Sequence, residues 1–196
     1  MNNLKYFALS KHIPIISDEA LSVIKTVIMA NNYKTMLELG TAIGYSSIML
    51  SDNLNYIETI EKKSALYEEA LNQIALHQKE NIIIARLGDA LKLTPLKDKY
   101  DLIFIDAAKG QYINYFKRFQ DYLNDGGAII TDNLNFHNLE LEFVSKQTKK
   151  LLKKIDDFKS FLITNNDFET SFLDQGDGLS ISIRKGAKDE IIINNP

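Results

Sequence analysis

Two carboxylates and one amide follow neighbouring apolar runs of the sequence. Asp106 ends the run at residues 100–106, while Asp132 ends the run at residues 127–132 and is followed by Asn133. If the runs are parallel strands, their carboxyl ends meet at one rim of the sheet and these side chains converge there. Such oxygen ligands suit a hard cation such as Mg²⁺, with Ca²⁺ or Mn²⁺ as alternatives. The simpler alternative is that they only cap the following turns.

Lys109 stands shortly after Asp106, just before a predicted helix. A cation is unfavourable there, because the first N–H groups of a helix already present positive charge. Beside a metal ion, the same repulsion would favour the neutral amine and make it available as a general base. Alternatively, Lys109 is a solvated loop lysine.

Residues 37–46 (LELGTAIGYS) have the pattern of a strand that runs into two glycines and then a helix. Gly40 and Gly44 would let the backbone approach a ligand at the strand's carboxyl end, and we assign Glu38 and Gly40 to a cofactor site. The Gly-x-x-x-Gly spacing differs from the Gly-x-Gly-x-x-Gly of dinucleotide-binding enzymes, which weakens an NAD-dependent oxidoreductase as an alternative. A tight turn without a ligand is the other alternative.

Acidic residues end the next two predicted strands. Glu61 lies about twenty residues beyond Gly40, where a carboxylate can accept hydrogen bonds from the ribose of an adenosine ligand. Asp89, followed by Ala90, occupies the next strand end, where a carboxylate could accept from an adenine amino group. A charged residue at a strand end is common, so Glu61 alone is weak support.

These residues need a parallel sheet to bring them together. Five short β-rich runs, at residues 35–40, 55–61, 82–89, 100–106 and 127–132, alternate with segments of helical spacing. The first helix is expected at residues 18–30, and crossover helices at residues 64–77 and 111–123. A long helix to about residue 162 and a β-hairpin at residues 168–173 and 179–183, around a Gly176-Asp177-Gly178 turn, complete the pattern.

The composition excludes several classes of protein. The 196 residues, 45% of them hydrophobic, can bury a full core, and we expect one domain over residues 1–196 with a loose end at about 188–196. The absence of cysteine excludes disulfides and cysteine-ligated metals, and a net charge of -3 offers no general nucleic-acid coat. No apolar run approaches the roughly 18 residues of a membrane span, so a soluble, cytoplasmic protein is expected.

One face of the long helix after Asn133 is basic. This face could grip phosphates, or it could be the solvated side of an ordinary amphipathic helix. The basic residues are Lys146, Lys149, Lys150, Lys153 and Lys154, and the opposite face carries Val144, Leu151, Leu152, Ile155, Phe158 and Leu162. The histidines share no ligand spacing and are interpreted as surface or core residues; they are His12, His77 and His137.

At these motifs the chain resembles the metal-dependent O-methyltransferases that use S-adenosylmethionine, a family that includes catechol and caffeoyl-CoA O-methyltransferases. The likeness is greatest to the bacterial branch, which includes tRNA 5-hydroxyuridine methyltransferases. It runs from about residue 11 to residue 185 and is carried by residues 40–46 (GTAIGYS), 104–112 (FIDAAKGQY), 129–133 (IITDN) and 176–179 (GDGL).

The resemblance implies roles for single residues. It implies a divalent metal, Mg²⁺ or a similar cation, on Asp106, Asp132 and Asn133, with Lys109 as the base. It implies contacts to S-adenosylmethionine from Ile16, Ser46, Glu61, Asp89, Ala90 and Asp106.

The resemblance also implies the fold and the reaction. The expected fold is a doubly wound, Rossmann-like α/β domain with a seven-stranded, mostly parallel sheet whose last strand is antiparallel. The expected reaction is O-methylation of a hydroxyl beside a second oxygen, either 5-hydroxyuridine in tRNA or a small catechol-like molecule. A homodimer is one expected assembly, and a catalytically silent cofactor-binding protein is a further alternative.

Overall fold

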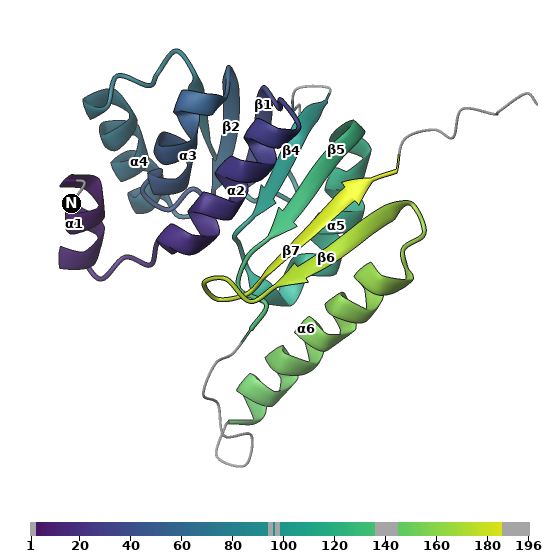
Figure 1. The fold of residues 1–196 in the computed structure, drawn as a ribbon. Coiled ribbons are helices and arrows are strands. Elements are labelled where there is room, and N and C mark those ends of the chain that lie inside the picture. The colour runs from purple at the N-terminus through teal and green to yellow at the C-terminus, as the bar shows by residue number, and fades with distance from the viewer. Residues whose placement is uncertain (1–2, 94–95, 97–98, 136–144, 186–196) are drawn as a thin grey trace, which may run out of the picture.

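A seven-stranded sheet runs through the centre of the protein (Figure 1). The computed structural model describes residues 3–93, 96, 99–135 and 145–185. The strands lie in the order β3-β2-β1-β4-β5-β7-β6. In chain order they are β1 (Thr35–Leu39), β2 (Tyr56–Glu61), β3 (Ile83–Leu87), β4 (Tyr100–Ile105), β5 (Leu123–Thr131), β6 (Phe168–Leu173) and β7 (Leu179–Arg184).

The strand directions confirm the expected fold. The pairs among β1 to β5 are all parallel, whereas β7 is antiparallel to both β5 and β6. The chain winds outward from β1 to β3 and then returns to β4 on the other side of β1. Ligands of such sheets bind beyond the carboxyl ends of the strands where the order reverses, here β1 and β4.

Helices cover both faces of the sheet because side chains alternate along each strand. Met36 joins a core formed with α1 (Asn3–Ser10), α2 (Asp18–Ala30) and α3 (Tyr45–Leu50), while Leu37 joins a second core. That second core contains residues of α5 (Tyr112–Phe119) and α6 (Lys146–Thr164). The remaining helices are α4 (Ser64–Leu76) and the 3-10 turns η1 (Ser51–Asn53), η2 (Lys109–Gln111) and η3 (Gln120–Tyr122).

The helix α1 was not expected, because we predicted the first helix at residues 18–30. It is short, and it has neither an acidic residue in its first turn nor a basic residue in its last turn, so its sequence alone is a weak signal. Its buried Leu4 and Ala8 pack against the first core, and Lys5 forms an ion pair with Asp18 of α2. Tertiary packing therefore stabilises this helix.

The other differences concern the ends of elements. The helix expected at residues 111–123 ends at Phe119 and continues as η3, and β5 begins at Leu123 instead of residue 127. The first part of β5 contains Gly126, at a φ of +71°, and pairs irregularly with β4. This irregularity hides the start of the strand from a pattern of alternation.

Several expectations concern residues that lie outside the described part of the chain. They are the loose end at about residues 188–196, His137 and Val144. Among the residues that are described, no helix combines the length and apolar character needed to cross a membrane. The single domain over residues 1–196 stays a prediction.

Candidate active site

A cavity of about 500 Å³ opens at the carboxyl ends of β1, β2 and β4, where the strand order reverses. Five of the predicted site residues line it: Gly40, Glu61, Asp89, Ala90 and Asp106. Further lining comes from other residues at the strand ends, from the segment before α2 and from α4 and α5, the last three of which contribute Ile13, Pro14, Leu66 and Tyr115. The sequence pattern therefore identified the rim of the sheet but not the cover of the cavity.

Gly40 is required by a close approach between β1 and β4. Its φ is +102°, and a Cβ atom there would lie 1.9 Å from the carbonyl oxygen of Asp106. The backbone N–H of Asp106 in turn donates to the carbonyl of Leu39 at 2.9 Å. Any larger residue at position 40 would separate the strand ends that carry the two halves of the site.

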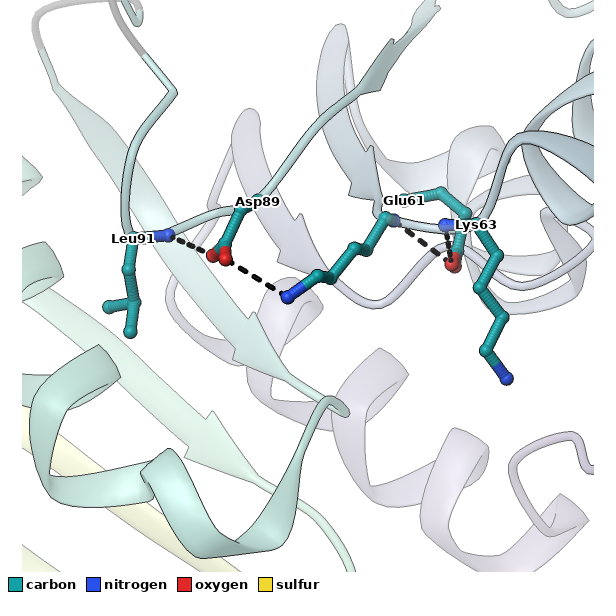
Figure 2. A network of polar contacts seen from close by, with 5 residues as sticks. Glu61, Lys63, Asp89 and Leu91 are labelled. Carbon is teal, nitrogen blue, oxygen red and sulfur yellow. Dashed lines mark hydrogen bonds and ion pairs between the residues drawn. The ribbon is translucent and has the colours of Figure 1, made fainter.

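The carboxylate of Glu61 is held by three backbone N–H groups, and Figure 2 shows the two donated by the residues that directly follow Glu61. Ala42 of the glycine loop donates to Oε2 at 2.9 Å, and Lys62 and Lys63 donate to Oε1 at 3.0 and 2.9 Å. Oε1 already accepts two hydrogen bonds, whereas Oε2 accepts one and can take a second. Glu61 is thus fixed beside the cavity while keeping acceptor capacity for a ligand.

Asp89 is also held in place. Its Oδ2 accepts from the Lys62 ammonium at 3.0 Å, and its Oδ1 accepts from the backbone N–H of Leu91 at 3.0 Å (Figure 2). The Lys62 hydrogen bond is the largest of the contacts that lower the pKa of Asp89. The carboxylate is therefore ionised at neutral pH.

Glu38, Ser46 and Ile16 do not line the cavity. Glu38 is fully buried and accepts hydrogen bonds from the hydroxyls of Ser46, Ser47 and Thr59. Burial raises the pKa of Glu38. This network joins β1 and β2 to the start of α3, so it supports the glycine loop from beneath. Direct cofactor contacts by Glu38, Ser46 and Ile16 stay predictions.

The structure brings Asp106 and Asp132 together, as expected for a shared ligand site. The backbone N–H of Asp132 donates to the carbonyl of Ile105 at 3.1 Å, which places the two strand ends side by side. Burial, followed by the charge of Asp132, raises the pKa of Asp106 to about 7. Burial is also the largest cause that raises the pKa of Asp132, to about 6. Two carboxylates in this position lack sufficient compensating positive charge.

Asn133 follows in the left-handed conformation, with a φ of +64°, and its backbone N–H donates to Asp132 Oδ1 at 2.7 Å. Tyr112 is buried beneath the site, and its hydroxyl donates to the carbonyl of Asp132 at 2.8 Å. The donor set at this rim consists of oxygen atoms alone, which fits a hard divalent cation. The raised pKa values of its two carboxyl groups, caused first by burial, fit the same group.

Lys109 begins η2, directly before α5, as the sequence indicated. Its positive charge lowers the pKa values of both Asp106 and Asp132, so its ammonium lies close to these carboxylates. It lines a smaller cavity of about 210 Å³ next to the first, together with Lys154 of α6. Lys154 donates to the carbonyl of Gly110 at 3.2 Å, so α6 supports the turn that carries Lys109.

Three residues near the site were missed from the sequence. Tyr115 stood out only as part of an apolar helix face, and nothing distinguished it from its core neighbours. Lys62 could have been found, since it directly follows Glu61. Asp177 lies close enough to raise the pKa values of both Asp106 and Asp132, but its proximity depends on which strand the terminal hairpin joins. That pairing is not visible in the sequence.

The histidines take no part in either cavity within the described residues. His12 lies in the exposed turn after α1 with a φ of +54°. His77 caps the end of α4, with its Nδ1 at 2.8 Å from the carbonyl oxygen of Gln73.

Comparison with known proteins agrees with this geometry. The family model described as O-methyltransferase matches residues 2–185. A caffeoyl-CoA O-methyltransferase of Medicago sativa is 30% identical in an alignment 169 residues long, which covers 78% of this chain and 68% of that protein. A caffeoyl-CoA O-methyltransferase of Citrus natsudaidai is 30% identical in an alignment 168 residues long, which covers 78% of this chain and 72% of that protein.

Solved structures give the same result. A candidate caffeoyl-CoA O-methyltransferase of Staphylococcus aureus has a TM-score of 0.86 and 37% identity, covering 92% of this chain and 90% of that chain. The O-methyltransferase of Bacillus cereus in complex with SAH has a TM-score of 0.80 at 21% identity over 92% of this chain and 88% of that chain, a likeness of fold. The chain therefore belongs to the O-methyltransferase family, and it is an enzyme that uses S-adenosylmethionine to methylate oxygen.

Proposed function

We propose that the protein is a divalent-metal-dependent O-methyltransferase whose acceptor hydroxyl stands beside a second oxygen. The observation that supports this most is the meeting of Asp106, Asp132 and Lys109 next to a cavity of about 500 Å³. Asp106 lines the cavity and also faces Asp132, so it belongs to both halves of the site. Methyl donor and acceptor would meet there.

The residues of the first cavity would hold S-adenosylmethionine. Glu61 can accept a further hydrogen bond at Oε2 and would bind a ribose hydroxyl. Asp89 can accept further hydrogen bonds as well and would bind an adenine amino group. The Gly40 loop and Tyr115 would line the same ligand. The cofactor supplies the methyl group on a positively charged sulfur.

Asp106, Asp132 and Asn133 would hold the cation. When bound, a divalent cation supplies charge stabilisation for an oxygen that loses its proton. Two adjacent oxygens of the acceptor would complete its coordination, which is why we propose an acceptor whose hydroxyl stands beside a second oxygen.

Lys109 would remove the proton of the acceptor hydroxyl. It lies close to both carboxylates, in the turn directly before α5. The acceptor oxygen then forms a bond to the methyl carbon while the bond from carbon to sulfur breaks. Lys109 afterwards releases its proton to solvent, which completes the balance.

For the acceptor, we propose 5-hydroxyuridine in tRNA, which offers its 5-hydroxyl beside the 4-carbonyl. The predicted basic face of α6 is exposed at Lys149, Lys150, Lys153 and Lys154. It reaches the active site, because Lys154 contacts the turn that carries Lys109. Phosphates bound along α6 would therefore lie next to the proposed base.

A small catechol-like molecule is the second candidate acceptor. It is favoured by the plant relatives, which are named for caffeoyl-CoA, since a caffeoyl group carries two adjacent hydroxyls. The basic face is also interrupted, because Lys153 forms an ion pair with Asp157 at 3.2 Å.

The acceptor is tested by methyl transfer from labelled S-adenosylmethionine with Mg²⁺ present. The substrates are tRNA that contains 5-hydroxyuridine, the same tRNA without it, and a panel of catechols including caffeoyl-CoA. Transfer to the first tRNA alone is the expected result. Efficient catechol turnover with no transfer to either tRNA would assign the enzyme to small-molecule chemistry.

Charge reversal then tests the basic face. The variant Lys149→Glu/Lys150→Glu/Lys153→Glu should weaken tRNA binding by about tenfold or more and flatten its salt dependence, since phosphate contacts are lost. A matched control reverses Lys34, Lys99 and Lys185, which are exposed at the opposite rim of the sheet. Equal tRNA activity in both variants would show that α6 does not bind the substrate.

A further inference from the structure

We infer that the β6–β7 turn positions the metal-ligand segment, with Gly178 and Asn135 as its positioning residues. The inference rests on the proposed metal site at Asp106, Asp132 and Asn133. The turn belongs to a hairpin that joins the sheet through β7, next to β5. It lies at the same rim as the end of β5, because β7 is antiparallel to β5 and Ser180 pairs with Thr131.

Two main-chain hydrogen bonds connect the turn to the residues after the proposed ligands. The backbone N–H of Leu134 donates to the carbonyl of Gly178 at 3.0 Å, and that of Asn135 donates to the carbonyl of Asp177 at 2.7 Å. They come immediately after Asn133, which has left the extended conformation of β5. The turn therefore takes over from the sheet in fixing this backbone.

Both neighbours of Asn133 are anchored by further contacts. After it, Leu134 is 2% exposed and packs in the second core, and before it, the carbonyl of Asp132 accepts a hydrogen bond from the Tyr112 hydroxyl. Asn133 is thus fixed between two anchored neighbours. Its left-handed conformation, uncommon for a residue other than glycine, needs such support.

Gly178 permits the contact between turn and segment. It is buried at a φ of +83°, and an added Cβ atom would lie 2.5 Å from Asn135 Cγ and 2.9 Å from Asn135 Cβ. Rotation of the Asn135 amide group would not remove this clash, because Asn135 Cβ is also too close to the added atom. The backbone of Asn135 would have to move, and its bond to Asp177 would move with it.

The side chain of Asn135 extends the connection to α6. Its Nδ2 donates to Asp174 Oδ1 at 2.9 Å, before the turn, and its Oδ1 accepts from Lys159 Nζ of α6 at 3.2 Å. One amide therefore joins the ligand segment, the hairpin and the helix. Residues that orient metal ligands in this way commonly affect metal affinity by about 10–100-fold.

The opposite side of the turn has a different neighbour. A Cβ atom added at Gly176, which has a φ of +61°, would lie 2.4 Å from Ser17 Oγ and 3.3 Å from Ala20 Cβ. Ser17 caps α2, so this contact is directed away from the metal segment. Gly176 and Gly178 therefore offer a matched pair of substitutions within one turn.

The experiment measures Mn²⁺ binding by electron paramagnetic resonance in the full-length protein without a methyl donor. Gly178→Ala should raise the Kd for Mn²⁺ by about tenfold or more while leaving the affinity for S-adenosylhomocysteine within about twofold. In turnover assays, the metal concentration for half-maximal rate should rise more than kcat falls. If Gly178 only stabilised the fold, its substitution would not weaken metal binding while leaving cofactor binding nearly unchanged.

Two controls separate positioning from strain. Gly176→Ala disturbs the same turn toward α2, and Gly126→Ala adds strain at a φ of +71° where an added Cβ atom has nothing within 4 Å. Both should bind Mn²⁺ like the original protein. If Gly178→Ala fails to fold, Asn135→Ala, which removes the side-chain connection alone, should still weaken Mn²⁺ binding by a few-fold.

The outcomes distinguish this inference from the proposed function. Absence of Mn²⁺ binding in the original protein, or unchanged binding in Asp132→Ala, would contradict the metal site itself. Loss in Asp132→Ala together with unchanged binding in both Gly178→Ala and Asn135→Ala would overturn the role of the turn. Equal losses in Gly176→Ala and Gly178→Ala would overturn it as well.

Discussion

The two halves of the active-site rim hold their carboxylates in opposite electrostatic states. At the ends of β2 and β3, Glu61 and Asp89 accept hydrogen bonds from backbone N–H groups and from Lys62. At the ends of β4 and β5, Asp106 and Asp132 face each other, and their pKa values are raised to about 7 and about 6. The first half is complete before any ligand arrives, whereas the second has a shortage of positive charge.

This difference indicates how the halves would bind their ligands. The cofactor half offers a preformed surface, and preorganisation reduces the loss of freedom on binding. In the proposed metal half, burial and then neighbouring negative charge raise the pKa values of the carboxyl groups, and a divalent cation would offset both effects. Lys109 offsets part of these effects, since its charge lowers both pKa values. We therefore expect substitutions in the two halves to affect different measurements.

The largest effect is expected from Asp132→Ala. It should reduce turnover by about a thousandfold or more, because the cation loses a ligand at a site that depends on its charge. Binding of S-adenosylhomocysteine, measured by calorimetry, should stay within about twofold, since Asp132 does not line the cofactor cavity. Asp125→Ala, an exposed site at the opposite rim, is the control. Normal turnover in Asp132→Ala would show that the acidic pair is structural.

A second substitution tests the proposed base. Lys109→Met should lower kcat by about 10²–10⁴-fold with little change in cofactor affinity, and the loss should shrink at high pH as hydroxide replaces the amine. Lys99→Met is the control, because Lys99 is an exposed lysine at the opposite rim of the sheet. An unchanged rate in Lys109→Met would show that Lys109 is a solvated loop lysine and not the base.

The raised pKa values predict an unusual dependence of stability on pH. Because Asp106 and Asp132 bind protons more tightly in the folded than in the unfolded protein, the metal-free protein should lose stability as the pH rises through the window from about 4 to about 7. We expect the free energy of unfolding to fall by about 2–4 kcal/mol between pH 5 and pH 8.

Denaturant titrations at both pH values measure this change. Mg²⁺ should restore stability at pH 8 but have little effect at pH 5, where protons compete for the ligands. Asp132→Asn should show a smaller dependence on pH. Stability that rises steadily from pH 5 to pH 8 in the metal-free protein would contradict the electrostatic difference between the halves.

The smallest effect is expected in the cofactor half. Glu61→Gln places an amide N–H₂ among three backbone N–H donors, so the loop around Ala42 should loosen. Affinity for S-adenosylmethionine should fall by roughly tenfold while Mn²⁺ binding is unchanged. The unaltered protein should bind S-adenosylmethionine and not NAD. Tight NAD binding without S-adenosylmethionine binding would assign the glycine loop to another cofactor.

The parts of the site that could be predicted from the sequence are those with a local signal. Glu61, Asp89 and Asp106 follow apolar runs, and parallel strands bring such positions to one rim whatever the details of packing. The fold followed from the same alternation and from the family resemblance, and the strand order confirms it. Elements with strong periodicity, such as α2 and α4, were found almost to their ends.

The parts that could not be predicted depend on contacts between distant segments. The helix α1 is stabilised by packing, Tyr115 differs from its core neighbours only by its place over the cavity, and Asp177 reaches the site through the pairing of β7 with β5. The buried network of Glu38 depends on such contacts as well, because its carboxylate accepts from the hydroxyls of Ser46 and Ser47 and from that of Thr59 on the neighbouring strand. A direct cofactor contact by Glu38 stays a prediction.

The central claim is that the cofactor half binds its ligand without the metal, whereas methyl transfer requires the metal. It is tested most directly by removing the metal from one preparation of the protein. Binding of S-adenosylhomocysteine and methyl transfer to the best acceptor are measured in a chelator and again after Mg²⁺ is added. We predict that binding is the same in both conditions, that transfer is absent in the chelator, and that Mg²⁺ restores it. Full methyl transfer in the chelator would contradict a metal-dependent reaction at Asp106, Asp132 and Asn133.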